Sequence, residues 1–208
     1  MAAFGGGVVS ALLLCDRHVA PNPLFTSNTL GIIWTACWWA INYFPGDLIF
    51  TLQQFLPIRM ASRMCLTILR IGLVVARVDL AVKLFPGVLA APLVLGTVAG
   101  SAGKFVADSI LLVSSTGTPG ELSMPGFVWR SGFLCSVAYY GVVHVGEVLT
   151  AQQGRALMLM LFVVHSMLSD VVGGACDFTE PIASVLHLLL NVPRPALAMT
   201  TTRAKKNA

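Results

Sequence analysis

Four arginines lie on one face of a long apolar segment, and their spacing is the feature of this sequence that most clearly suggests chemistry. They are separated by four, seven and seven residues: Arg59, Arg63, Arg70 and Arg77. At about 100° per residue, these intervals return to nearly the same direction on an α-helix. A charged side chain at the centre of a bilayer costs at least about 2.5–3.5 kcal/mol. The arginine stripe should therefore face protein, water or anionic headgroups, which indicates a role involving ions, phosphates or voltage.

The composition of the chain is that of a membrane protein. Its 208 residues are 56% hydrophobic and 11% charged, with a net charge of +4, whereas soluble domains carry about 25% charged residues. Basic residues gather in the arginine stripe and the C-terminal tail without interleaved aromatic residues, so nucleic acid is not expected as a partner. The five cysteines include no CxxC pair, and neither a zinc site nor a disulfide framework is expected. The sequence also lacks a nucleophile elbow and an HExxH pattern, so we expect no enzyme.

Apolar runs of about 20 residues predict an all-α, polytopic membrane protein. We expect a short apolar segment followed by five full spans, near residues 4–14, 29–54, 60–84, 87–113, 127–149 and 155–173. Together these segments form a predicted transmembrane domain over residues 1–175. Residues 181–192 are too short to span comfortably and should form an interfacial helix or a packed part of the tail.

The C-terminal tail, residues 176–208, is expected to be cytosolic. It carries four basic residues, Arg194, Arg203, Lys205 and Lys206, and basic residues favour the cytosolic side of a membrane. Its last four residues are KKNA, which fits the dilysine pattern that returns proteins to the endoplasmic reticulum.

Two glycine clusters lie within the predicted spans. The first is Gly5, Gly6 and Gly7, and the second is Gly96, Gly100 and Gly103. Small residues at such spacings let membrane helices pack closely. Alternatively, glycines break a helix, and the freed carbonyl groups then line a polar cavity. The second interpretation, with an interrupted helix in each half, indicates an inverted-repeat channel or transporter.

A few polar residues beside these clusters are candidates for a pore lining. Lys104 and Asp108 are four residues apart, so they either neutralise each other on one helix face or line the pore. Ser10 follows the first cluster, and Asp47 is expected either to lie in a cation path or to pair with an arginine. His144, three residues before a glutamate, suggests a metal site or a proton relay, but a polar helix end explains it better.

The order and spacing of several short motifs resemble the trimeric intracellular cation channels of the endoplasmic and sarcoplasmic reticulum. The motifs are FGGG at 4–7, Ser27-Asn28, Trp38, FPGDL at 44–48, FLPIR at 55–59 and the second glycine cluster. The resemblance covers roughly residues 1–175. It implies two inverted three-helix repeats plus a seventh helix, assembled as a homotrimer in which each protomer has a pore for potassium and other monovalent cations. It also implies a phosphoinositide bound by basic residues near the pore.

The sequence departs from the pattern of this family in three places. The chain opens almost at the first glycine cluster, so we expect that the first helix of the family and the start of the second either precede this sequence or have been lost. The Lys-Glu of a Lys-Glu-Val-x-Arg motif falls on Leu66 and Thr67, which leaves only Arg70, and Ala99 stands where a basic residue is usual. We hypothesise that Arg63 and Arg77 replace the lost lysine in lipid binding and gating.

From these features we expect a potassium channel of the reticulum membrane that supplies counter-ion flux during calcium release. Its fold would be an inverted-repeat helix bundle with two glycine-kinked helices. Membrane lipids would be its partners. We expect a bound phosphoinositide, and no metal or other cofactor. The alternatives are a secondary transporter with alternating access and a non-conducting, lipid-binding relative.

Overall fold

The computed structural model describes residues 2–14, 28–43, 47–114, 126–172, 178, 179 and 181. Contacts divide the chain into two compact units, Met1–Cys176 and Asp177–Ala208. All the helices with assigned bounds belong to the first unit. The predicted helix 181–192 lies outside the described residues after its first position, as do the KKNA end and most of FPGDL.

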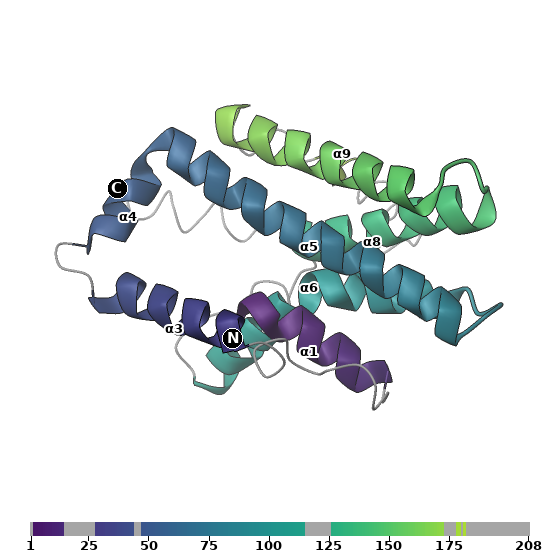
Figure 1. Cartoon of the computed structure of the whole chain (residues 1–208), viewed down its shortest axis with the longest axis horizontal. Coiled ribbons are helices and arrows are strands. Elements are labelled where there is room, and N and C mark those ends of the chain that lie inside the picture. Colours follow the sequence, from purple (N-terminus) through teal and green to yellow (C-terminus); the bar gives the residue numbers. More distant parts are fainter. Residues whose placement is uncertain are drawn as a thin grey trace, which may run out of the picture. The chain divides into compact units, whose positions relative to one another are not determined.

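The described part of the first unit is helical and contains no strand (Figure 1). Its elements in chain order are α1 (Ala2–Leu14), α3 (Asn28–Tyr43), α4 (Leu48–Gln54), α5 (Leu56–Leu84), α6 (Ala90–Val113), α8 (Phe127–Tyr140), the π-helical turn η2 (Gly141–Val145) and α9 (Ala151–Val172). The all-α class predicted from the apolar runs is confirmed.

The predicted span 29–54 is two helices instead of one. α3 ends at Tyr43, and α4 begins at Leu48. The residues between them include Pro45, and a proline in a helix interior removes one backbone hydrogen bond and clashes with the preceding turn. Hydropathy alone does not separate the two helices, because both are apolar.

The predicted span 127–149 also differs, because regular α-helix ends at Tyr140. The next residues form the π-helical turn η2, which ends at Val145. The amide of Gly146 donates to the carbonyl of Gly141 at 2.8 Å, which is the five-residue spacing of a π-helix. Glu147 then has a φ of 50°, and this left-handed conformation takes the chain out of the helix.

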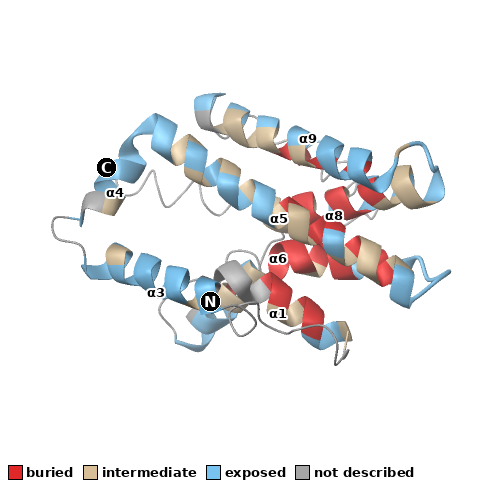
Figure 2. Cartoon of the chain, viewed as in Figure 1, coloured by how far each residue is buried: buried red, intermediate tan, exposed pale blue. Residues whose placement is uncertain are grey.

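The core forms where α5 meets α6, α8 and α9. Its largest group of buried side chains comes from one face of α5, at the i, i+3, i+4, i+7 spacing of an amphipathic helix: Ile71, Val74, Val75, Val78 and Ala81. Figure 2 shows the buried residues gathered at this crossing. The earlier half of α5 is far more exposed, with Leu66 at 61% and Leu69 at 71%. The helix therefore has one half in the core and one half outside it.

The exterior of the unit is strongly apolar. Large hydrophobic side chains of α3 are exposed, including Trp34, Trp38 and Trp39. Among the described helices, the segment Ala90–Ile110 of α6 is long and apolar enough to cross a membrane, and half of it is buried. Apolar patches of this extent mark a surface that binds protein or membrane.

The glycine clusters allow close packing of helices. Both α1 and α6 run through their clusters as unbroken helices, so the broken-helix interpretation does not hold in this structure. A Cβ atom at Gly6 would lie 2.0 Å from the carbonyl oxygen of Ala99, and one at Gly96 would lie 2.4 Å from the hydroxyl of Ser136. Only a residue without a side chain fits at these two contacts.

We predict that Gly6→Ala destabilises the protein while Gly7→Ala does not. The methyl group at position 6 would overlap backbone of α6, and overpacking of this kind costs about 1–3 kcal/mol. A Cβ at Gly7 meets nothing within 4 Å, and alanine is favoured over glycine in a helix by about 1 kcal/mol. Thermal unfolding of the detergent-solubilised variants, followed by circular dichroism, should give a lower midpoint for the first variant alone. Equal midpoints would contradict close packing of α1 on α6.

Candidate functional site

The arginines of α5 have different surroundings along the helix. Arg63 and Arg70 line a hollow with a volume of about 240 Å³. Arg77 is half-buried and reaches a carbonyl group of α1 at 3.5 Å. Arg59 lies in the first turn of α5, where its amide donates to the carbonyl of Phe55 at 3.0 Å. The stripe predicted from the spacing therefore serves more than one site.

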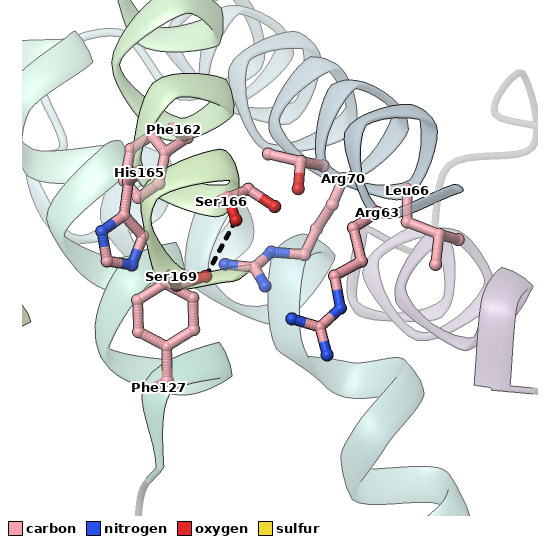
Figure 3. A pocket seen from close by; sticks show the side chains of 9 residues that line it. Arg63, Leu66, Arg70, Phe127, Phe162, His165, Ser166 and Ser169 are labelled. Carbon is pink, nitrogen blue, oxygen red and sulfur yellow. Dashed lines mark hydrogen bonds between the residues drawn. The ribbon is translucent and has the colours of Figure 1, made fainter. Parts of the chain in front are cut away.

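The hollow lies between α5, α8 and α9 (Figure 3). Its lining consists of Arg63, Leu66, Thr67, Arg70, Phe127, Phe162, His165, Ser166 and Ser169. Two guanidinium groups, an imidazole and three hydroxyl groups thus share a space with three large apolar side chains. Such a lining suits a molecule with an anionic head and an apolar body.

Arg70 is held by contacts with α8. Its guanidinium donates a hydrogen bond to the hydroxyl of Ser131, which in turn donates to the carbonyl of Phe127. The guanidinium carbon lies 5.8 Å from the centroid of the Phe127 ring, within the range of a cation–π interaction. The same ring lies 5.0 Å from the ring of His165 on α9. Arg70 is therefore oriented by aromatic and hydroxyl groups from a neighbouring helix.

The hydroxyl groups of α9 complete the polar side of the hollow. Ser169 donates its hydroxyl hydrogen to the carbonyl of Ser166 at 2.9 Å, so its remaining hydrogen-bonding capacity is that of an acceptor. Figure 3 shows the guanidinium of Arg70 directed towards Ser169. A guanidinium presents several N–H donors in a planar fork that matches a phosphate or a carboxylate. The arrangement therefore offers guanidinium donors of Arg63 and Arg70 to a phosphate or carboxylate in the hollow.

Arg77 is not among the residues that line the hollow. Its guanidinium donates to the carbonyl of Gly7 at 3.5 Å, and the hydroxyl of Ser10 donates to the same oxygen at 3.1 Å. The helical spacing groups Arg77 with Arg63 and Arg70. The structure instead places Arg77 against the first glycine cluster, where it links α5 to α1.

Lys104 and Asp108 are in contact on α6. The ammonium nitrogen lies 3.3 Å from a carboxylate oxygen, and the side chain of Asp108 is 1% exposed while that of Lys104 is 49% exposed. The pair therefore joins a buried anion to a half-exposed cation. Gly103 precedes the pair on the same helix, and Gly5 lies in α1, which packs against α6.

Asp47 starts α4 in a left-handed conformation, with a φ of 50°. Its carbonyl oxygen accepts a hydrogen bond from the hydroxyl of Thr51 at 3.2 Å. Its carboxylate forms no ion pair with any of the described residues. The arginine partner considered for it in the sequence analysis is therefore not found in that part of the chain.

A cluster around Asp79 was missed in the sequence analysis. The carboxylate of Asp79 on α5 meets Tyr139, His144 and Arg155, which come from three other elements. His144 thus contacts Asp79, whereas the sequence analysis considered it only beside Glu147. An acid inside an apolar helix is a functional candidate by default, and that rule could have identified Asp79.

Comparisons with known proteins agree with the arrangement of the helices. The model of the TRIC channel family matches residues 1–172. A relative from Danio rerio, the trimeric intracellular cation channel type B, is 30% identical over 117 residues, which are 56% of this chain and 39% of the relative. The type 1B.2 channel of Caenorhabditis elegans is 22% identical over 188 residues, which are 89% of this chain and 59% of the relative. The chain thus spans less than two thirds of the length of these relatives.

Two solved structures share the fold. One comes from work on the activity of TRIC counter-ion channels in calcium release; it has a TM-score of 0.68 and 20% identity, and the match covers 81% of this chain and 75% of that chain. The other is a trimeric intracellular cation channel from C. elegans without Ca²⁺, with a TM-score of 0.64 and 19% identity over 84% of this chain and 74% of that chain. With a family model that matches residues 1–172, this polytopic helical membrane protein belongs to the TRIC channel family.

Proposed function

We propose that the protein is a channel for potassium and other monovalent cations in the membrane of the endoplasmic or sarcoplasmic reticulum. The observation that carries this proposal is the match of residues 1–172 to the TRIC channel family. The relatives are named trimeric intracellular cation channels, and one similar structure is described as a counter-ion channel in calcium release. By analogy, the protein assembles as a homotrimer and supplies counter-ion flux while calcium is released.

We assign the cation path to the region of α1 and α6. Support comes from the polar groups that these otherwise apolar helices carry: Ser10 on α1, and Lys104 and Asp108 on α6. The buried carboxylate of Asp108 is a negative charge in a region of low dielectric, where it attracts cations strongly. The half-exposed ammonium of Lys104 is close enough to reduce that attraction. The balance between the negative charge of Asp108 and the positive charge of Lys104 would then set the cation conductance.

We assign a phosphoinositide to the hollow lined by Arg63 and Arg70. The two guanidinium groups would bind headgroup phosphates, while Thr67 supplies a hydroxyl group and Ser169 an acceptor for a hydroxyl of the inositol ring. Leu66 and other apolar lining residues suit the acyl part of a lipid. Arg77 is left out of this site because it contacts the carbonyl of Gly7 instead.

The two assignments fit together electrostatically. A cation path does not gain from guanidinium groups in it, because like charges repel. The hollow is formed by α5, α8 and α9, whereas the proposed path follows α1 and α6. A lipid anion in the hollow would neutralise Arg63 and Arg70, whereas Arg77 lies beside α1 with its guanidinium on the carbonyl of Gly7.

The purified protein in planar bilayers should give unitary currents under a potassium gradient. We expect the reversal potential to approach the equilibrium potential of potassium, because the path carries a buried carboxylate and excludes anions. Saturable flux that depends on a coupled substrate, without resolved unitary currents, would favour a secondary transporter. No flux from intact trimers would favour a non-conducting, lipid-binding relative, and both results contradict the channel proposal.

Opposite changes in conductance are expected from the two members of the α6 pair. Asp108→Asn leaves the ammonium of Lys104 uncompensated and should lower the unitary potassium conductance by at least about threefold, since an unpaired cation beside the path repels potassium. Lys104→Gln should leave the conductance unchanged or raise it. Ser109→Ala is the matched control, because among the described residues this exposed serine bonds its own helix, at the carbonyl of Phe105. A decrease in both charge variants would contradict the assignment of the path.

Loss of both hollow arginines should weaken lipid binding. Arg63→Gln combined with Arg70→Gln removes two charge-assisted contacts, each worth about 1.5–3 kcal/mol, so we expect at least about a tenfold loss of affinity for phosphoinositide nanodiscs. Arg77→Gln is the control from the same stripe and should bind normally. Nanodiscs with phosphatidylserine at equal charge separate headgroup recognition from general attraction to anionic lipid. Equal losses in the control and the double variant would contradict the hollow as the lipid site.

A further inference from the structure

Asp79 holds together four elements of the fold. One of its carboxylate oxygens accepts a hydrogen bond from the hydroxyl of Tyr139 on α8 at 2.9 Å. The same oxygen lies 3.0 Å from Nε2 of His144 in η2. The other oxygen lies 3.7 Å from the guanidinium of Arg155 on α9. A single side chain of α5 is thus the common partner of three groups that are otherwise separate.

The π-helical turn makes this arrangement possible. Tyr139 and His144 are five residues apart, and on a regular α-helix such residues point about 140° away from each other. In a π-helix the backbone hydrogen bonds join residues i and i+5, so each turn is wider than in an α-helix. The Gly146 amide bond to the carbonyl of Gly141, at 2.8 Å, has this spacing. His144 lies in this wider turn, directly after the end of α8, and shares one oxygen of Asp79 with Tyr139.

The side chains of the Asp79 cluster range from fully buried to half-exposed. Tyr139 is fully buried, the side chain of Asp79 is 20% exposed, and that of Arg155 is 51% exposed. The rings of Tyr139 and Tyr140 lie 5.8 and 5.9 Å from the ring of His144. A carboxylate that is mostly removed from water needs such partners. The contacts of Asp79 therefore belong to the packed structure and are not a chance pairing at the surface.

The Asp79 cluster lies towards the C-terminal end of α5, whereas the hollow is lined by the N-terminal half of this helix. Asp79 is nine residues beyond Arg70, a rise of about 13 Å along a helix. The half of α5 that begins at Leu56 is largely exposed. The position of the whole arginine helix is thus set by the core and by its contact with α8, η2 and α9 through Asp79.

We propose that Asp79 is a positioning residue that fixes the end of α5 and so controls how readily the arginine helix moves when the channel opens. This inference rests on the proposed channel function for its effect on gating. We call the contacts of Asp79 with Tyr139, His144 and Arg155 the latch. The π-helical turn and Tyr139 form one part of it, and Arg155 forms the other. A membrane potential acts on the arginines of α5, and the Asp79 cluster resists their displacement.

The test compares Asp79→Leu with Glu147→Gln. Glu147 lies three residues after His144, is exposed and has no ion pair among the described residues, so it controls for loss of an acid at this end. Hydrogen–deuterium exchange of the intact protein in nanodiscs should show at least about tenfold faster exchange at residues 142–148 in the first variant only, because locally opened backbone exchanges faster. Tyr139→Phe, which keeps the buried ring, should give a smaller increase.

Gating is measured on the same proteins in planar bilayers. We expect Asp79→Leu to change the open probability at a fixed voltage by at least about threefold while the unitary conductance stays constant, and Asp79→Glu to restore part of the wild-type behaviour. Combining Tyr139→Phe with Asp79→Leu should add little, since both act through one contact. A fully additive effect overturns the shared latch.

The outcomes separate the latch from the channel proposal. Wild-type exchange at residues 142–148 in Asp79→Leu overturns the latch. Faster exchange with unchanged open probability overturns the positioning role in gating. Faster exchange in a protein whose wild type carries no current supports the latch and overturns the proposed channel function.

Discussion

The arginines of α5 are the constraint on which the rest of the structure depends. A guanidinium group in an apolar protein needs partners, and this chain supplies them from other helices. Ser131 and Phe127 of α8 hold Arg70, while the carbonyl of Gly7 accepts from Arg77. The neighbours of α5 are therefore fixed by the polar contacts of its arginines as well as by its apolar face.

Close packing at the glycine clusters makes these contacts possible. The backbone of α1 reaches the carbonyl of Ala99 because Gly6 has no side chain, and Gly96 gives the same freedom to α6 against Ser136. The bundle is then compact enough for Arg77 to reach α1 and for Asp79 to reach α8. Two features flank α5 as a result: the hollow lined by Arg63 and Arg70 and the carboxylate cluster at Asp79.

Apolar runs of about 20 residues predicted the helical class. The 3.6-residue repeat predicted the arginine stripe and gave the contact of Lys104 with Asp108 as one of two alternatives. The repeat did not separate Arg77 from Arg70, because the helices that the two guanidinium groups meet, α1 and α8, are set by tertiary packing. It also missed the partnership of Asp79 with His144. That contact depends on a π-helical turn and on a neighbouring helix, and neither leaves a signal in the local pattern. The short motifs in order indicated the family, which no single spacing could have done.

The most direct test of the account is an electron cryo-microscopy structure of the protein in nanodiscs that contain a phosphoinositide and potassium. We expect a homotrimer with headgroup phosphate density within hydrogen-bonding distance of Arg63 and Arg70, and a separate hydrated path beside Lys104 and Asp108. A hollow without lipid density, or a hydrated path that runs past the guanidinium of Arg70, would contradict it.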